Sequence, residues 1–185
     1  VFQQDIRRAL MQVGRPFFSR DRGVDTGYVE EVSRGAISLS TSKTGGLIVM
    51  EKSVDLSAYF DTGVVIDAEI SRELLLTIFN NNSPIHDGAV IVSKGRLFKA
   101  GCILPLTEKE LARGLGTRHR AAVGLSEETD AVIVVISEKT GGISIVNEEK
   151  IDLGVEPTSV PGRLKRLLLP GGEGKKGLMS WRFRG

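Results

Sequence analysis

The stretch AVIVVISEKTGGISIV, residues 131–146, decides the fold class of this chain. AVIVVIS and GGISIV are rich in β-branched residues and predict two strands, which the segment EKTG joins. Strands that are apolar almost throughout are typical of a sheet that helices cover on both faces. We therefore expect an α/β domain built around a central sheet.

Other apolar segments extend this sheet. LIVMEK (47–52), GAVIVS (88–93) and RLFKAGCILPL (96–106) predict further strands. Lys94 and Gly95 separate the last two and predict a hairpin, so the sheet is expected to be mixed. The sequence KTGG occurs twice, each time before β-forming residues, and indicates turn chemistry used twice, not a duplicated domain.

Helical periodicity alternates with these strands. The spacing of apolar residues predicts helices in FQQDIRRALMQVGR, in DTGYVEEVSRGAI and in SRELLLTIFNNN, the last beginning near Ser71 or Asp67. In TEKELARGLG, Thr107 and Glu110 stand at the spacing of a capping box, which predicts a further helical stretch. Strands and helices thus follow one another along most of the chain.

The bulk composition fits a soluble globular domain. Of the 185 residues, 41% are hydrophobic and 26% charged, and 25 basic against 23 acidic side chains leave a net charge of +2. This small excess argues against a polyanion binder, so no nucleic-acid partner is expected. The one cysteine, Cys102, lies in an apolar run and is interpreted as a small buried hydrophobe.

The extent of the domain is predicted from composition. No stretch approaches the roughly 18 apolar residues that span a bilayer, and no signal-peptide pattern is present. The chain begins at Val1 without a methionine, and we expect it to be a fragment of a longer protein. One domain is expected over 1–160. Residues 161–185 are basic and glycine-rich, which predicts a helix and then a partly disordered tail, both outside the core.

The first group of candidate functional residues includes one of the two histidines. His86 stands beside Asp87 in NNNSPIHDGAVIV, where Gly88 and Ala89 open a strand. Because these two small residues lack bulk, a ligand can approach the backbone closely there. Asp87 can accept a proton from a hydroxyl or hold a divalent cation against phosphate oxygens. An Asp-Gly pair is also common in turns of purely structural role, so that alternative stays open.

The second group lies in LGTRHRAA, where the other histidine stands between two arginines. The guanidinium groups of Arg118 and Arg120 match phosphate oxygens in bidentate geometry. Gly116 and Thr117 let a backbone amide and a hydroxyl join them, especially if a helix begins near Thr117. The alternative is a solvated basic turn paired with nearby acids such as Glu127 and Glu128.

A third group follows the strand AVIVVI. Ser137 and Glu138 stand at its carboxyl end, where α/β sheets often place ligand-binding groups. Glu138 can contact a metal ion or a nucleotide. A lone carboxylate at a strand end is also an ordinary surface charge, and this alternative stays open too.

Taken together, the sequence resembles the diadenylate cyclase (DAC) domain family, whose members make cyclic di-AMP from two ATP molecules. The matching segments are HDGAVIV, AGCILPLT, LGTRHRAAVGLSEETDA and VVISEKTGGIS. They contain the DGA and RHR motifs of the family in the family's order, and the similarity covers most of residues 1–160. The opening FQQDIRRALMQVGR resembles the membrane-associated, CdaA-type bacterial subtype, where this segment follows transmembrane helices. Lys139 is a departure, because members often carry a second acidic residue there.

The resemblance implies a fold, an activity and a set of roles. We expect the DAC fold, a central mixed sheet covered by helices on both faces. We expect a nucleotidyltransferase in which the ribose 3′-hydroxyl of each ATP attacks the α-phosphate of the other. Catalytic roles are implied for Asp87, Arg118, His119 and Arg120. Nucleotide contacts are implied for Gly88, Ala89, Gly101, Leu104, Gly116, Thr117, Ser137 and Glu138. Metal contacts, with Mg²⁺ or Mn²⁺, are implied for Asp87, His86 and Glu138.

The resemblance also implies partners. Because each domain would hold one ATP, it implies a homodimer whose two-fold interface is the active site. It implies regulatory proteins, and a full-length protein anchored in the cell membrane with this domain on the cytoplasmic face. The alternative is a module that senses ATP or a dinucleotide without turnover. Asp87 disfavours that alternative, because a pure phosphate binder gains nothing from an extra negative charge unless a metal is shared.

Overall fold

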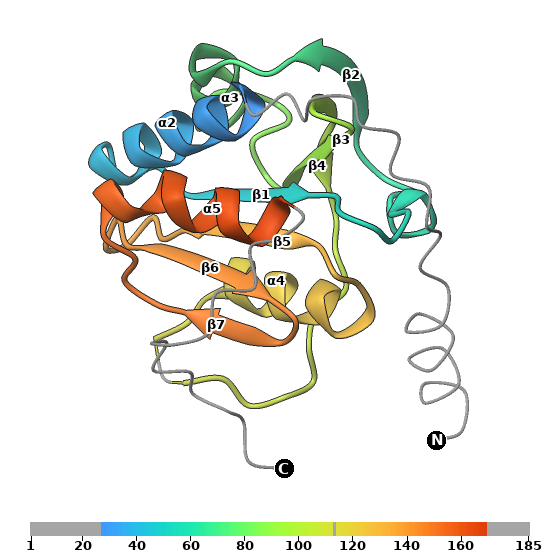
Figure 1. Ribbon diagram of the computed structural model, residues 1–185, viewed down its shortest axis with the longest axis vertical. Coiled ribbons are helices and arrows are strands. Elements are labelled where there is room, and N and C mark those ends of the chain that lie inside the picture. Colours follow the sequence, from blue (N-terminus) through green and yellow to red (C-terminus); the bar gives the residue numbers. More distant parts are fainter. Residues whose placement is uncertain (1–26, 113, 170–185) are drawn as a thin grey trace.

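Seven strands form one mixed sheet in the computed structural model, which describes residues 27–112 and 114–169. The strands are β1 (Gly46–Met50), β2 (Val64–Glu69), β3 (Ala89–Ser93), β4 (Arg96–Cys102), β5 (Val132–Ile136), β6 (Ile143–Asn147) and β7 (Lys150–Asp152). Their order across the sheet is β2-β4-β3-β1-β5-β6-β7 (Figure 1). β1 and β3 pair in parallel, and the other neighbouring strands pair antiparallel. The predicted mixed sheet is therefore confirmed.

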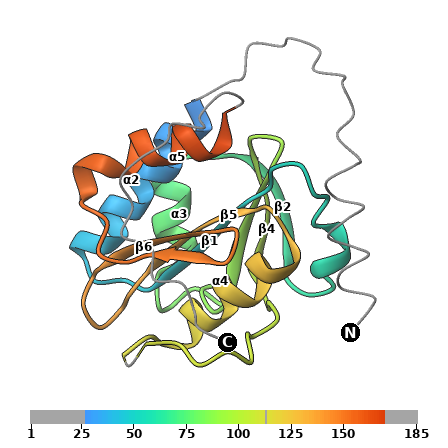
Figure 2. The ribbon, with the colours of Figure 1, turned by 60° about the horizontal axis from the view of Figure 1, so that its bottom comes forward.

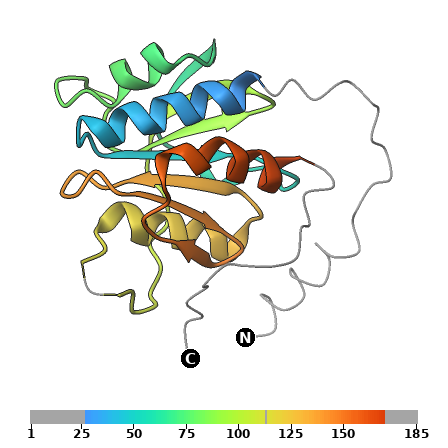
Figure 3. The same cartoon turned by 60° about the vertical axis from the view of Figure 1, so that its left-hand side comes forward.

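Helices cover both faces of this sheet. α2 (Gly27–Thr41), α3 (Arg72–Ile78) and α5 (Val160–Leu168) pack on one face, and α4 (Thr117–Glu128) packs on the other. Figure 2 shows the sheet between α2 and α5 above and α4 below, and Figure 3 shows α2 and α5 side by side. Short 3₁₀ turns, η1 (Ser57–Tyr59) and η2 (Pro157–Ser159), lie in the connections. The predicted arrangement of a covered central sheet is confirmed.

The burial of both faces of β1 explains why its sequence is apolar without interruption. Ile48 and Met50 pack in the core beneath α2, whereas Leu47 and Val49 pack in the core beneath α4. All four side chains are 3% exposed or less. Successive side chains of a strand point to opposite faces, and both faces of β1 are covered. If polar and apolar residues alternated along β1, the polar side chains would therefore be buried without hydrogen-bond partners.

Turn residues confirm two local predictions. Lys94 and Gly95 have φ of 51° and 76° and form the tight hairpin between β3 and β4, as predicted. The side chain of Ser71 accepts a hydrogen bond from the amide of Leu74 and caps α3, so Ser71 is the residue that begins this helix. The helix predicted in FQQDIRRALMQVGR lies outside the described residues.

The helical stretch predicted at Thr107 is wrong. Between β4 and α4 the described residues form no helix. Thr107 is 1% exposed and donates a 2.5 Å hydrogen bond to Glu127, in the last turn of α4. The hydroxyl of Thr107 also accepts a bond from the amide of Lys109. Because Thr107 is held against α4 by these bonds, its capping-box partner Glu110 is not used for a cap.

The helix expected after residue 160 is present as α5, but the prediction that it lies outside the core is wrong. Val160 and Leu164 are fully buried in the same cluster as α2 and the sheet. Ion pairs add to this packing, between Lys165 and Glu30 and between Arg163 and Asp152. Arg163, Lys165 and Arg166 of the basic segment lie on α5, and the tail predicted beyond residue 169 lies outside the described residues. No helix in the described ranges is long and apolar enough to span a membrane.

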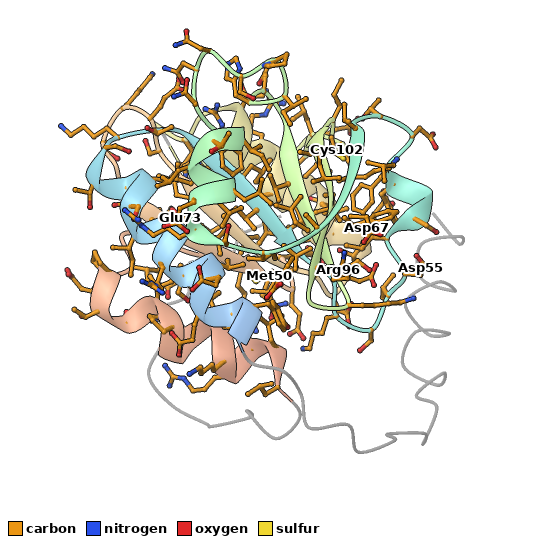
Figure 4. All side chains as sticks on the ribbon, turned by 90° about the horizontal axis from the view of Figure 1, so that it is seen from above. Met50, Asp55, Asp67, Glu73, Arg96 and Cys102 are labelled. Carbon is orange, nitrogen blue, oxygen red and sulfur yellow. The ribbon has the colours of Figure 1, made fainter. Side chains whose placement is uncertain are left out.

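The edge strand β2 is interrupted by a bulge. Its register against β4 shifts between Val65 and Ala68, and Asp67 has the unusual φ of 45°. The guanidinium of Arg96 donates 2.8 Å and 2.5 Å hydrogen bonds to the carboxylate and the carbonyl of Asp67. Figure 4 shows Arg96 and Asp67 side by side. Arg96 therefore fixes the conformation of the bulge.

We expect Leu164→Ala to lower the free energy of unfolding by about 2–5 kcal/mol, because it leaves a cavity between α5 and the core. Arg166→Ala, on the exposed side of the same helix, is the control and is expected to change it by less than about 0.5 kcal/mol. Urea denaturation of the two variants measures the difference. Equal, small effects would mean that α5 does not belong to the folded core.

Candidate active site

The strand pairing brings three separate sequence groups to one edge of the sheet. β1 and β3 are parallel and so begin at the same edge, while the antiparallel strands β4 and β5 end there. Asp87 stands just before β3, and Glu138 stands just after β5. β3 and β5 flank β1, so these two backbones lie about 10 Å apart, twice the usual strand spacing. Asp87 is exposed and makes no hydrogen bond or ion pair with another described residue.

Gly88 is required by the packing of β4. Its φ is +122°, and a Cβ added to it would lie 2.7 Å from the carbonyl carbon of Gly101 and 2.9 Å from the amide nitrogen of Cys102. Ala89 pairs with Cys102 and is fully buried. The space beside Gly88 and Ala89, interpreted above as room for a ligand, is therefore filled by β4 on this side. The tight approach fixes where Asp87 leaves the sheet.

The loop before Asp87 is also tied down. The Nδ1 atom of His86 lies 2.6 Å from the carbonyl oxygen of Ser83, which leaves Nε2 as the ring nitrogen for any ligand. Gly101 has φ of 70°, and a Cβ there would lie 3.6 Å from Ile85 in the same loop. Cys102 is fully buried, as predicted, and burial raises the pKa of its thiol. Because its side chain is inaccessible, Cys102 is not a candidate nucleophile.

α4 begins at the RHR motif. Gly116 is the residue before the helix, and Thr117 is its first residue, so the condition stated above for a phosphate-binding helix end is met. The first amides of a helix have no acceptor within the helix and carry a partial positive charge. The exposed hydroxyl of Thr117 lies beside them. This end of α4 is therefore suited to bind phosphate oxygens.

Arg118 connects the RHR motif to the third sequence group. Its Nη1 atom donates a 2.7 Å hydrogen bond to Glu138, whose side chain is 62% exposed. Within the described ranges, no arginine of the motif pairs with Glu127, so the alternative of a basic turn neutralised by that acid is not what the structure shows. Ser137, beside Glu138, closes the β5–β6 turn, with its hydroxyl accepting from the amide of Thr140.

His119 points in another direction from Arg118. It is 6% exposed, and its Nε2 lies 3.1 Å from the hydroxyl of Ser144 on β6. Burial lowers the pKa of His119, which favours the neutral imidazole. Consecutive helical residues project about 100° apart, so His119 anchors the helix while Arg118 stays at the sheet edge. This placement favours a positioning role and not contact with phosphate.

Arg120 holds the loop that follows β4. Its Nη2 donates a 3.2 Å bond to the carbonyl of Thr107, and the amide of Thr107 donates a 3.1 Å bond to the carbonyl of Arg120. Gly124 permits this contact, because a Cβ there would lie 2.4 Å from the carbonyl oxygen of Pro105. Leu104, for which the family resemblance implies a nucleotide contact, is 6% exposed at the start of this loop. Arg120 therefore fixes the loop against α4.

The predicted metal ligands do not form a complete site by themselves. Among the described residues, no three carboxylate, histidine or cysteine groups lie close enough to hold an ion. Glu138 is paired with Arg118, whereas Asp87 and the Nε2 atom of His86 remain available. These two groups suit a divalent cation whose other ligands come from phosphate oxygens and water.

Sequence reasoning did not single out several residues of the site. Ser144 and Gly124 lie in the segments that match the family but outside its DGA and RHR motifs, and both act through contacts with segments far away in the chain. Gly45 lies under the guanidinium of Arg118. The only available signal was the repeated KTGG, whose first copy contains Gly45.

We expect the protein to lose stability below about pH 6.5, because the unfolded chain binds a proton on His119 more readily than the folded chain does. The stabilising contribution is complete above the unfolded pKa and is lost as the pH falls, by up to about 1.4 kcal/mol per pH unit. His119→Gln, which keeps a polar group near Ser144, is expected to flatten this dependence. Urea titrations of both proteins between pH 5 and 8 test this, and identical slopes would contradict it.

Comparison with known proteins identifies relatives over most of the chain. Residues 33–151 match the family model DAC, described as DisA bacterial checkpoint controller nucleotide-binding. Cyclic di-AMP synthase CdaA from Bacillus subtilis is 40% identical over 151 residues, covering 78% of this chain and 55% of that protein. A diadenylate cyclase from Listeria monocytogenes is 38% identical over the same shares. The chain thus spans about half the length of the curated relatives it matches.

Solved structures agree with the family match. A crystal structure of DacA from Staphylococcus aureus, a double cysteine mutant, matches with a TM-score of 0.75 and 36% identity, covering 78% of this chain and 97% of that one. A hypothetical membrane spanning protein from Bacillus cereus matches with a TM-score of 0.66 and 41% identity, covering 69% and 63%. With the DGA and RHR motifs at one edge of the sheet, these matches show that the chain belongs to the DAC family of nucleotide-binding domains.

Proposed function

We propose that this domain is a diadenylate cyclase, which condenses two ATP molecules into cyclic di-AMP and two pyrophosphates. The observation that carries the proposal is the position of Asp87 and Arg118 at the same edge of the sheet, on strands and a helix that the packing holds firmly. The relatives named diadenylate cyclase and cyclic di-AMP synthase support it. Position and charge suffice for such phosphoryl transfer, which needs little covalent help from the protein.

The reaction joins two nucleotides by two equivalent steps. In each, a ribose 3′-oxygen forms a bond to the α-phosphorus of the other ATP, and the bond from that phosphorus to the bridging oxygen of pyrophosphate breaks. Asp87 accepts the proton of the hydroxyl, and its exposure leaves it accessible to the ribose. The first amides of α4, Thr117 and Arg118 hold the triphosphate and stabilise charge on the leaving pyrophosphate.

The remaining residues of the site act by holding these groups. His119 fixes the start of α4 on β6, and Arg120 fixes the loop after Leu104. Leu104 and the end of β4 form one wall for the base. Glu138 pairs with Arg118, and we propose nucleotide contacts for Glu138 and for its neighbour Ser137, as the family resemblance implies.

A divalent cation, Mg²⁺ or Mn²⁺, is part of this proposal. Asp87 would hold it together with triphosphate oxygens, and His86 offers Nε2 as a further ligand. When bound, such an ion neutralises phosphate charge and lowers the pKa of a coordinated hydroxyl.

Catalysis requires two copies of the chain. One copy offers one Asp87 and one phosphate-binding helix end, which suffice for a single ATP. A two-fold axis that brings two such edges face to face places each 3′-hydroxyl near the opposite α-phosphate. We propose that the homodimer is the active form and that its interface is the active site.

The surroundings of the domain are also proposed. The Bacillus cereus relative is titled a membrane spanning protein, and the curated relatives extend well beyond the matched part. We infer that the full-length protein is anchored in the cell membrane, with this domain on the cytoplasmic face. Regulatory proteins are expected there, and the net charge of +2 favours no nucleic-acid partner.

We expect Asp87→Asn to abolish cyclic di-AMP formation, with a loss of at least about 100-fold, because the amide cannot accept the hydroxyl proton. Stability is expected to stay close to wild type, since Asp87 makes no contact with another described residue. Most ATP binding is expected to remain, because the first amides of α4, Thr117 and Arg118 still hold the triphosphate. Glu128→Gln, an exposed residue in the last turn of α4, is the control. Mass spectrometry of the products formed from ATP and Mn²⁺ measures the rate. Full activity of Asp87→Asn would remove this carboxylate from the chemistry.

The wild-type reaction in the same assay separates the cyclase from the sensing module. A cyclic dinucleotide identifies turnover, whereas intact ATP after incubation at high protein concentration would favour a module that binds without reacting.

We also expect the rate to rise faster than linearly with protein concentration at high dilution, because two chains must meet to complete the site. The product formed per unit protein is measured over a concentration series, alongside sedimentation to establish the fraction of dimer. A rate strictly proportional to protein in a range where the chain is monomeric would contradict a shared active site.

A further inference from the structure

We propose that Gly45 is a positioning residue of the nucleotide site, because its missing side chain provides the space in which the guanidinium of Arg118 lies. The inference rests on the proposed function for its role in catalysis. A Cβ added to Gly45 would lie 2.5 Å from Nη1 and 2.7 Å from Cζ of Arg118, and 3.0 Å from a carboxylate oxygen of Glu138. Any larger residue would therefore displace the Arg118–Glu138 pair.

Contacts of Arg118 explain why this space matters. Nη1 is bonded to Glu138, but Nε is the one buried side-chain nitrogen or oxygen in the described ranges without a hydrogen-bond partner. A guanidinium offers five N–H donors in a fixed plane, and most arginines in fixed positions use several of them. The guanidinium of Arg118 is thus held by its packing against Gly45 more than by a full set of hydrogen bonds. The orientation of the guanidinium plane toward a phosphate therefore depends on this packing.

The turn that contains Gly45 also supports the partner of Arg118. Gly45 lies in the first KTGG turn, between α2 and β1, and Glu138 opens the turn that contains the second KTGG. The hydroxyl of Ser40, at the end of α2, donates a 2.5 Å bond to the carbonyl of Gly141. A Cβ at Gly141 would lie 2.5 Å from the carbonyl oxygen of Ser40 and 3.3 Å from the side chain of Lys43, so the second turn packs against the end of α2 and the start of the first turn. The segment that carries Gly45 therefore also contacts the turn that follows Glu138.

Replacement of Gly45 by alanine is a selective perturbation. Its backbone lies outside the left-handed region that only glycine tolerates well, in contrast to Gly141 at φ of +76°. The atoms that a methyl group would meet are the ends of two long side chains, which can move. Gly45→Ala is therefore expected to fold normally with the Arg118 guanidinium displaced.

The first test follows the Nε–H of Arg118 by ¹H–¹⁵N NMR, with Arg118→Lys used to identify the signal. A buried Nε–H exchanges slowly with water. Gly45→Ala is expected to shift this signal and remove its protection. Gly162→Ala is the control, since a Cβ at Gly162 in the first turn of α5 meets no atom within 4 Å. An Arg118 signal in Gly45→Ala that coincides with wild type would overturn the proposal, whatever the protein catalyses.

The second test is a double-mutant cycle on ATP affinity and on kcat/KM for cyclic di-AMP. Gly45→Ala alone is expected to weaken ATP binding roughly tenfold, the value of one charge-assisted hydrogen bond. In an Arg118→Lys background the same change is expected to have less than about a twofold effect. Equal losses in both backgrounds would show that Gly45 does not act through Arg118. A wild-type protein that binds ATP without forming cyclic di-AMP would refute the proposed function and leave the affinity cycle to decide the role of Gly45.

Discussion

The parallel hydrogen bonding of β1 with β3 determines where the candidate residues of this protein lie. Because these central strands run the same way, both begin at one edge of the sheet, and their antiparallel neighbours β4 and β5 end there. Four chain segments far apart in sequence consequently present their loops together. α4 adds its positively polarised end to the same edge through the ion pair of Arg118 with Glu138. Reversal of β3 would carry Asp87 to the opposite edge and separate it from the arginine.

The sequence alone was sufficient for most strands of the sheet and for its mixed character. These features follow from local periodicity, from the Lys94-Gly95 turn and from residues that cannot continue a strand. The orientation of side chains within the RHR motif could not be read in this way. Arg118, His119 and Arg120 are adjacent in sequence, yet one pairs with Glu138, one is buried against Ser144 and one bonds the carbonyl of Thr107. Which segment packs against each face of a helix is a property of the whole fold.

The errors in interpretation share the same cause. Composition placed α5 outside the core because its basic residues dominate the count, whereas Val160 and Leu164 alone decide its packing. The spacing of Thr107 and Glu110 fits a cap, but a buried hydrogen bond to Glu127 competes with it. The glycines of the site also depend on contacts with remote segments. The absence of a side chain makes room for β4 at Gly88, for the loop after Leu104 at Gly124, and for the guanidinium of Arg118 at Gly45. A contact with a remote segment leaves no periodic trace in sequence.

The bulge in β2 has a consequence for how copies of this domain can associate. An edge strand offers unpaired amides and carbonyls, on which a second sheet can grow. In β2 the left-handed residue Asp67 breaks the regular pattern of those groups, and Arg96 occupies its carbonyl. Val64 and Val65 are half exposed on the same strand. An unbroken edge there would therefore offer exposed apolar side chains together with unpaired backbone groups to the strand of another chain. Even at protein concentrations at which two domains readily meet, the addition of further strands to β2, and so the formation of fibrils from this edge, is therefore obstructed.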